Sequence, residues 1–69
     1  MNTRNLRAEM VRHNISRKQI AYLCELSYSA AGERLKGNID FKVSELVGIR
    51  DTYFPTCTLD YLAGVSDER

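Results

Sequence analysis

The sequence is poor in the residues that build disulfide and metal sites. It has two cysteines far apart, Cys24 and Cys57, and a single histidine, His13. Two isolated thiols without further cysteines or a histidine pair support neither a disulfide framework nor a zinc site. Cys24 falls at the end of an expected helix, on one face with Ile20 and Leu23, where a small buried apolar residue is expected. No cofactor and no metal are therefore predicted.

Long apolar runs and catalytic groupings are also lacking. No stretch approaches the ~20 apolar residues that cross a membrane, and no signal peptide opens the chain. A cytoplasmic protein without membrane contact is expected. His13 stands beside no obvious carboxylate partner, and there is no glycine-rich phosphate loop. We interpret His13 as a polar helix end and predict neither an enzyme nor a small-molecule ligand.

What is present is the composition of one small globular domain. The 69 residues are 43% hydrophobic and 28% charged, with no strand pattern, repeat or low-complexity segment. A chain of this length forms one core, which contributes only about 3–5 kcal/mol of net stability. We therefore predict a single all-α domain over residues 1–69.

The sequence predicts a helix start in the middle of the chain, at Ser16. Gln19 follows three residues later, so each side chain can bond the other residue's backbone N–H in a capping box. Ile15 and Ile20 flank the box at the positions of a hydrophobic staple, which fixes the direction from which the chain enters the helix. This pattern predicts a helix of about two turns, from Arg17 to about Cys24.

A second helix start lies eleven residues further on, at Ser27. Leu26 precedes this hydroxyl cap, and Ala31 is placed as a small staple partner. Gly37 is placed to end the second helix in the left-handed conformation. Two short helices joined by a tight turn are expected, and a generic capped pair in a small helical bundle gives the same local pattern.

Three further helices are expected around this pair. Residues 3–13 carry Leu6, Met10 and Val11 on one face and end at His13-Asn14. After a linker over 38–42, apolar residues recur at helical spacing from 43 to about 52, without a strong cap, and Pro55 stops that helix. A short helix over 59–63 is capped by Thr58 and ended by Gly64, and residues 65–69 form a polar, frayed tail.

These elements together resemble the lambda-repressor-like (Cro/repressor, XRE-type) helix-turn-helix family over residues 3–64. The resemblance rests on order and spacing, and its pieces are Ser16 to Ala21, Leu26-Ser27, Leu35-Lys36-Gly37 and Thr58-Leu59-Asp60-Tyr61-Leu62-Ala63-Gly64. It implies a compact five-helix DNA-binding domain with a central helix-turn-helix over about 16–37. It also implies that the helix after Ser27 is the recognition helix.

The chain departs from the family pattern at three places. Glu25 stands in the turn where glycine is usual, and left-handed backbone there costs a non-glycine residue about 1 kcal/mol. Ala31 replaces an inward Ile or Val, and Arg34 stands where an apolar residue is common. We expect Leu35 to carry the packing and the recognition helix to sit closer to its neighbour.

The resemblance assigns base contacts to the exposed face of the second helix. Tyr28 and Ser29 directly follow the cap, where helix-turn-helix proteins meet base edges. Glu33 is expected to accept from a cytosine amino group or to exclude other bases. Gly32 costs about 1 kcal/mol relative to alanine inside a helix. Its presence indicates either close approach to DNA or tight packing on the preceding helix, and it is included among the predicted base contacts.

Phosphate contacts are expected from residues that surround this face. Arg17 and Lys18 open the first helix of the pair, where the helix dipole assists, although a solvated surface pair looks the same in sequence. The full set of predicted phosphate contacts is Arg17, Lys18, Ser27, Lys36, Asn38 and Lys42.

Charge is distributed unevenly along the chain. Residues 1–42 hold eight basic and four acidic groups, whereas residues 43–69 hold two basic and five acidic groups. The positive potential therefore lies in the half that carries the helix pair, as phosphate binding requires. The net charge of +1 is low for a strong DNA binder, so we expect a homodimer on a two-fold operator. The candidate dimer interface is Tyr53, Phe54, Tyr61 and Leu62, which could equally be intramolecular core.

The resulting functional hypothesis is a sequence-specific transcriptional regulator. It is similar to the small Cro-like repressors of phages and mobile elements, binds double-stranded operator DNA and excludes RNA polymerase from a promoter. An alternative of another class is a protein-interaction module of the same fold, an antirepressor that binds another phage repressor. The low net charge, together with Glu25 and Glu33 on the exposed side, keeps this alternative open.

Overall fold

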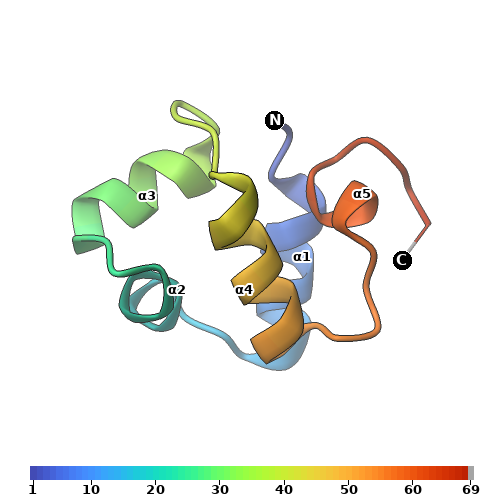
Figure 1. The fold of residues 1–69 in the computed structure, drawn as a ribbon, viewed down its shortest axis with the longest axis horizontal. Coiled ribbons are helices and arrows are strands. Elements are labelled where there is room, and N and C mark those ends of the chain that lie inside the picture. Colours follow the sequence, from blue (N-terminus) through green and yellow to red (C-terminus); the bar gives the residue numbers. More distant parts are fainter. Residues whose placement is uncertain (69) are drawn as a thin grey trace.

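The computed structural model describes residues 1–68, and this part of the chain forms five α-helices and no strand. The helices are α1 (Arg4–His13), α2 (Arg17–Cys24), α3 (Tyr28–Lys36), α4 (Val43–Tyr53) and α5 (Leu59–Leu62). The all-α prediction is confirmed, and each boundary lies within one residue of the expected one. α4 runs through the middle of the molecule and packs against α2 on one side and α5 on the other (Figure 1).

The predicted caps account for three of the helix starts. Ser16 Oγ accepts from Gln19 N–H at 3.3 Å, while Ser16 N–H donates to Gln19 Oε1 at 2.9 Å, so the capping box is complete. Ser27 Oγ accepts from the backbone N–H of the third helical residue at 3.0 Å, and Thr58 Oγ1 does so for Tyr61 at 3.0 Å. Each bond satisfies a backbone donor that has no partner within its helix.

The helix ends also follow local chemistry. Gly37 and Gly64 have φ of 86° and 80°, and Asn14 ends α1 with φ of 56°. α4 lacks a side-chain cap at its first position, as expected, but Glu45 Oε1 accepts from Lys42 N–H at 2.9 Å and steadies its first turn. The helix ends at Tyr53, just before the Phe54–Pro55 bond.

One apolar cluster draws on all five helices. Its buried members are Leu6, Met10, Ile20, Leu35, Phe41, Leu46, Ile49, Phe54, Cys57, Tyr61 and Leu62. The expectation for Val11 is wrong, because its side chain is 83% exposed. Val11 lies five residues after Leu6, which is well off the Leu6 stripe on a helix of 3.6 residues per turn. Glu9, which does lie on that stripe, is buried instead.

The buried Glu9 carboxylate joins α1 to α5. Oε2 accepts from the Tyr61 hydroxyl at 2.8 Å and pairs with Arg12, while Oε1 lies 3.5 Å from His13 Nε2 and accepts from Cys57 Sγ at 3.8 Å. The pKa of Arg12 is raised, first by hydrogen bonding to Tyr61 and also by the charge of Glu9, against the opposing effect of desolvation. Nothing in the apolar pattern of the sequence indicated this network.

The two ends of the chain pack against each other. Asn5 Nδ2 donates to the carbonyls of Tyr61 and Ser66 at 2.9 and 3.2 Å. Ser66 N–H bonds the Asp60 carbonyl at 3.2 Å, and Thr58 Oγ1 donates to the Glu68 carbonyl at 3.2 Å. The tail that was expected to fray is therefore joined by hydrogen bonds to α1 and to the start of α5 at Ser66 and Glu68. Arg69 lies outside the described residues.

Candidate functional site

The connection between α2 and α3 consists of three residues, Glu25 to Ser27. Glu25 has φ of 56° and ψ of 41°, so the left-handed geometry expected of this position is present without a glycine. Leu26 N–H bonds the Ala21 carbonyl at 2.9 Å, which closes the end of α2. Because the connection is short and closed by hydrogen bonds, it fixes α3 relative to α2 (Figure 1).

Replacing Glu25 by glycine is expected to stabilise the domain by about 0.5–1 kcal/mol, because glycine adopts left-handed backbone without the Cβ penalty. Urea denaturation of the two proteins measures the change. Glu25→Ala is the matched control: it removes the same side chain, keeps the Cβ and should gain nothing. Equal stabilisation by both variants would show that the carboxylate, rather than the backbone, was unfavourable.

The first turn of α3 is open to solvent. Tyr28 is 53% exposed, and Ser27 and Ser29 are also exposed. The cap bond from Ser27 holds this turn in helical geometry. Two of the four residues assigned to base contacts, Tyr28 and Ser29, are therefore on an accessible and locally ordered surface.

Arg17 crosses from α2 to α3 and stacks on Tyr28. Its guanidinium carbon lies 3.6 Å from the centroid of the tyrosine ring, the geometry of a cation–π contact. Arg17 Nε is buried without a hydrogen-bond partner, the only such side-chain atom among residues 1–68. Ser16, Arg17, Lys18 and Tyr28 line an open hollow at this point.

Gly32 makes room for that arginine. A Cβ built on Gly32 would overlap Arg17 Nη1 and lie 3.0 Å from its Cζ. The expectation that Gly32 belongs to the exposed face is wrong, because the residue is buried beneath the Arg17 side chain. Of the two explanations open from the sequence, packing on the preceding helix is the one observed.

The remaining predicted contacts are Lys18, at the start of α2, and a group around the far end of α3. Lys18, Lys36 and Lys42 are exposed, and none forms an ion pair within residues 1–68. Glu33 is half-buried and accepts from Asn38 Nδ2 at 2.7 Å, so a predicted base contact and a predicted phosphate contact are bonded to each other. The structure brings Arg17, Lys18, Ser27, Tyr28 and Ser29 together at one end of α3, with Gly32 beneath Arg17, and the others at the opposite end.

Three of the four residues assigned to a dimer interface are core residues. Phe54 is 1% exposed, and Tyr61 and Leu62 are also buried within the chain. The interface prediction is wrong for them, because their side chains are covered by α1 and α4 of the same molecule. Tyr53 is half-buried against the same cluster.

An ion pair between α3 and α4 accounts for the unusual Arg34. Arg34 Nε lies 3.1 Å from Glu45 Oε1, and both side chains are largely shielded from solvent, with 13% and 10% exposed. The sequence marked Arg34 only as a departure from the family pattern and did not indicate its partner. A basic residue at an inward helical position, with an acid in the first turn of the next helix, is the signal that could have found it.

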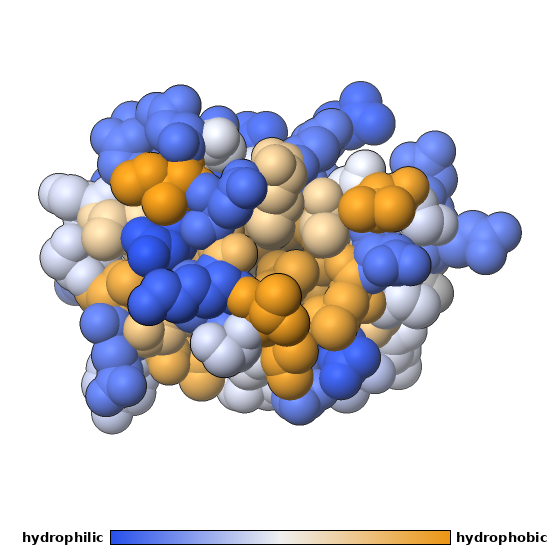
Figure 2. All heavy atoms as spheres, turned by 45° about the horizontal axis from the view of Figure 1, so that its top comes forward, coloured by the Kyte–Doolittle hydropathy of each residue, from blue (hydrophilic) through white to orange (hydrophobic). Residues whose placement is uncertain are grey.

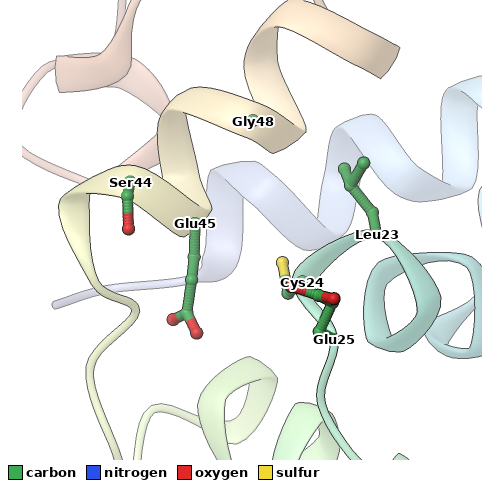
Figure 3. A pocket seen from close by; sticks show the side chains of 6 residues that line it. All are labelled: Leu23, Cys24, Glu25, Ser44, Glu45 and Gly48. Carbon is green, nitrogen blue, oxygen red and sulfur yellow. The ribbon is translucent and has the colours of Figure 1, made fainter.

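A second hollow lies on the seam between α2 and α4, lined by Leu23, Cys24, Glu25, Ser44, Glu45 and Gly48 (Figure 3). Its potentially reactive group is the Cys24 thiol, whose pKa is raised, chiefly by burial and also by the charge of Glu45. A raised pKa keeps the thiol protonated, which is unsuited to a nucleophile. Glu45 is occupied by Arg34 and by the Lys42 N–H. This hollow therefore lacks the features of a catalytic centre.

Residues 1–68 bring together no group of three His, Cys, Asp or Glu side chains that could hold a metal ion. Within the same residues no helix is long and apolar enough to cross a membrane.

Comparison of the chain with protein-family models, with curated proteins and with solved structures found no match. The arrangement of its own residues is therefore what supports a functional assignment.

Proposed function

We propose that this protein is a sequence-specific DNA-binding transcriptional regulator in which α2 and α3 form a helix-turn-helix. In this proposal α3 enters the major groove with its first turn towards the base edges, and α2 braces it across the backbone. The supporting observation is the exposed first turn of α3, with Tyr28 and Ser29, directly beside the basic start of α2.

The charges around the pair fit a polyanionic partner. Arg17, Lys18, Lys36 and Lys42 form no ion pair within residues 1–68, so their charges are not neutralised internally. Unpaired basic groups of this kind displace counterions from phosphates, which supplies most of the sequence-independent affinity for DNA. Arg12 and Arg50 pair with acids of their own helices, whereas Arg4 and Arg7 of α1 also form no ion pair within residues 1–68.

The biological role that follows is repression of the Cro type, for a phage or mobile element. A small domain bound at a promoter excludes RNA polymerase by occupying the same DNA. Two copies on a two-fold operator double the phosphate contacts, which compensates for the low net charge of +1.

Selection from random-sequence DNA duplexes, followed by binding of the enriched duplex over a salt series, tests the proposal. We expect one enriched sequence, with log affinity falling linearly against log salt concentration. Binding without any enriched sequence would contradict specific regulation, since a basic surface alone gives only non-specific affinity.

Replacing both Tyr28 and Ser29 by alanine is expected to abolish most of the discrimination between the enriched duplex and a scrambled one, by about 5- to 150-fold, because these side chains would no longer reach base edges. Competition binding at fixed salt measures it, with thermal melting to establish that the variant is folded. The paired control is Lys18→Ala, which should weaken binding to both duplexes alike. Unchanged discrimination in the folded double variant would refute the base-reading assignment.

A second candidate, an antirepressor that binds another repressor, is favoured by one surface. Met1, Phe41, Val43, Leu46, Leu59 and Val65 are among the residues that line a groove between the start of α4 and α5, and Val43 and Val65 are 75% and 77% exposed. Figure 2 shows apolar side chains gathered near the middle of this face among polar ones. Stoichiometric binding to a purified repressor encoded beside the gene, lost in Val43→Asp, with no enriched DNA, would favour this function.

A further inference from the structure

Arg17 was assigned to phosphate because it opens a helix, but its surroundings are more constrained than a phosphate contact needs. Its guanidinium is stacked at 3.6 Å on Tyr28, and Gly32 leaves the space into which Nη1 fits. Neither neighbour accepts a hydrogen bond from it. The contacts therefore fix the plane of the guanidinium without using its donors.

None of those donors has a partner among residues 1–68, but the buried Nε is out of reach of a ligand, so Nη1 and Nη2 are the donors left for one. Among residues 1–68, Arg17 forms no ion pair, and its Nε is buried without a partner. An unsatisfied buried donor is costly, and such a group in a native structure calls for an explanation. By comparison, Arg12, Arg34 and Arg50 each pair with a carboxylate, and Arg4 and Arg7, which form no ion pair within residues 1–68, have no buried unpartnered atom.

The position of the stack indicates which acceptor it faces. Tyr28 is the first residue of α3, the end of the helix assigned to base edges, and the stack brings Arg17 to that end although it belongs to α2. A planar guanidinium held in one orientation matches the O6 and N7 acceptors of guanine in the major groove. A planar guanidinium also meets phosphate with two parallel bonds, so it is the position beside the first turn of α3 that favours a base edge.

We propose that Arg17, held between the Tyr28 ring and the Gly32 backbone, reads a guanine in the operator and determines specificity at that base pair. This inference rests on the proposed function and reassigns one residue within it. Gly32 then acts as a positioning residue, since it touches the arginine and not the DNA.

The test measures base preference at every position of the selected duplex, for the unaltered protein and for two variants. Arg17→Lys keeps the charge and loses the planar fork. Gly32→Ala keeps the arginine and fills the space under it. Because only the end of a flexible side chain has to move, the alanine variant should fold. Both are expected to lose a guanine preference of about 5- to 150-fold at the same single base pair.

Tyr28→Phe and Tyr28→Leu provide a matched pair, read at that same base pair. Phenylalanine keeps the stacking face and should retain the guanine preference, whereas leucine should lose it. If the unaltered protein binds one sequence specifically while Arg17→Lys and Gly32→Ala leave every base preference unchanged, this inference is overturned and the proposed function stands. If the unaltered protein selects no sequence, both are overturned. Arg17→Ala could also weaken binding to all duplexes equally, with a slope of log affinity against log salt concentration shallower by about 1 and no change of base preference. That result would show that Arg17 contacts phosphate and not a base.

Discussion

Phe54→Ala is expected to leave the protein largely unfolded at room temperature. Phe54 is 1% exposed, and its ring meets His13 edge-on with centroids 5.3 Å apart. Replacing a buried phenylalanine by alanine costs about 3–5 kcal/mol, which is the whole net stability expected of a domain this small. Helical circular dichroism followed against urea measures the loss.

The matched control for this substitution is Val11→Ala. Val11 is 83% exposed on the same domain, so its truncation should change the free energy of unfolding by no more than about 0.5 kcal/mol. A Phe54→Ala protein that stays folded but changes its oligomeric state would contradict the burial of this residue and restore its role at a dimer interface.

Glu9→Ala is expected to cost about 1–3 kcal/mol, because it leaves the buried Tyr61 hydroxyl without an acceptor, whereas Arg12 and His13 are half-exposed and can be solvated. The Tyr61 hydroxyl would lose its 2.8 Å acceptor and Arg12 its carboxylate. Tyr61→Phe is a near-isosteric comparison that deletes one bond to the carboxylate and should cost about 1.5–3 kcal/mol.

The double variant shows whether the two residues act as a unit. If they do, Glu9→Ala combined with Tyr61→Phe should cost less than the two single changes added together, since the hydroxyl bond is already lost in the first. Additive costs from urea denaturation would mean that Glu9 and Tyr61 contribute independently and that the carboxylate does not organise α1 against α5.

Most of the helix boundaries were predictable because the signals that set them are local. Ser16, Ser27 and Thr58 each bond a backbone group within three residues, and Gly37 and Gly64 act through their own φ. Such signals need no knowledge of the rest of the fold. The left-handed backbone at Glu25 was predicted instead from the family resemblance, which places a glycine in that turn.

What could not be predicted are pairings between side chains far apart in sequence. The stacking of Arg17 on Tyr28 and the pairing of Arg34 with Glu45 depend on how the helices cross, which no local pattern specifies. Spacing alone could have placed Glu9 with Leu6 on the buried face, but only the packed structure shows the Tyr61 hydroxyl that makes a buried carboxylate tolerable. Gly32 was recognised as unusual from the sequence, but the reason for a glycine there is the side chain of Arg17, which belongs to another helix.

The Arg34–Glu45 pair also constrains how this sequence can change over generations. Loss of either residue leaves a shielded charge without its partner, so each single replacement passes through a less stable protein. A simultaneous change to two apolar residues of similar volume avoids that penalty and can be neutral or better. Homologous sequences should therefore keep both charges or lose both. Substitutions at positions 34 and 45 are expected to be correlated, whereas those at neighbouring surface positions are expected to be independent.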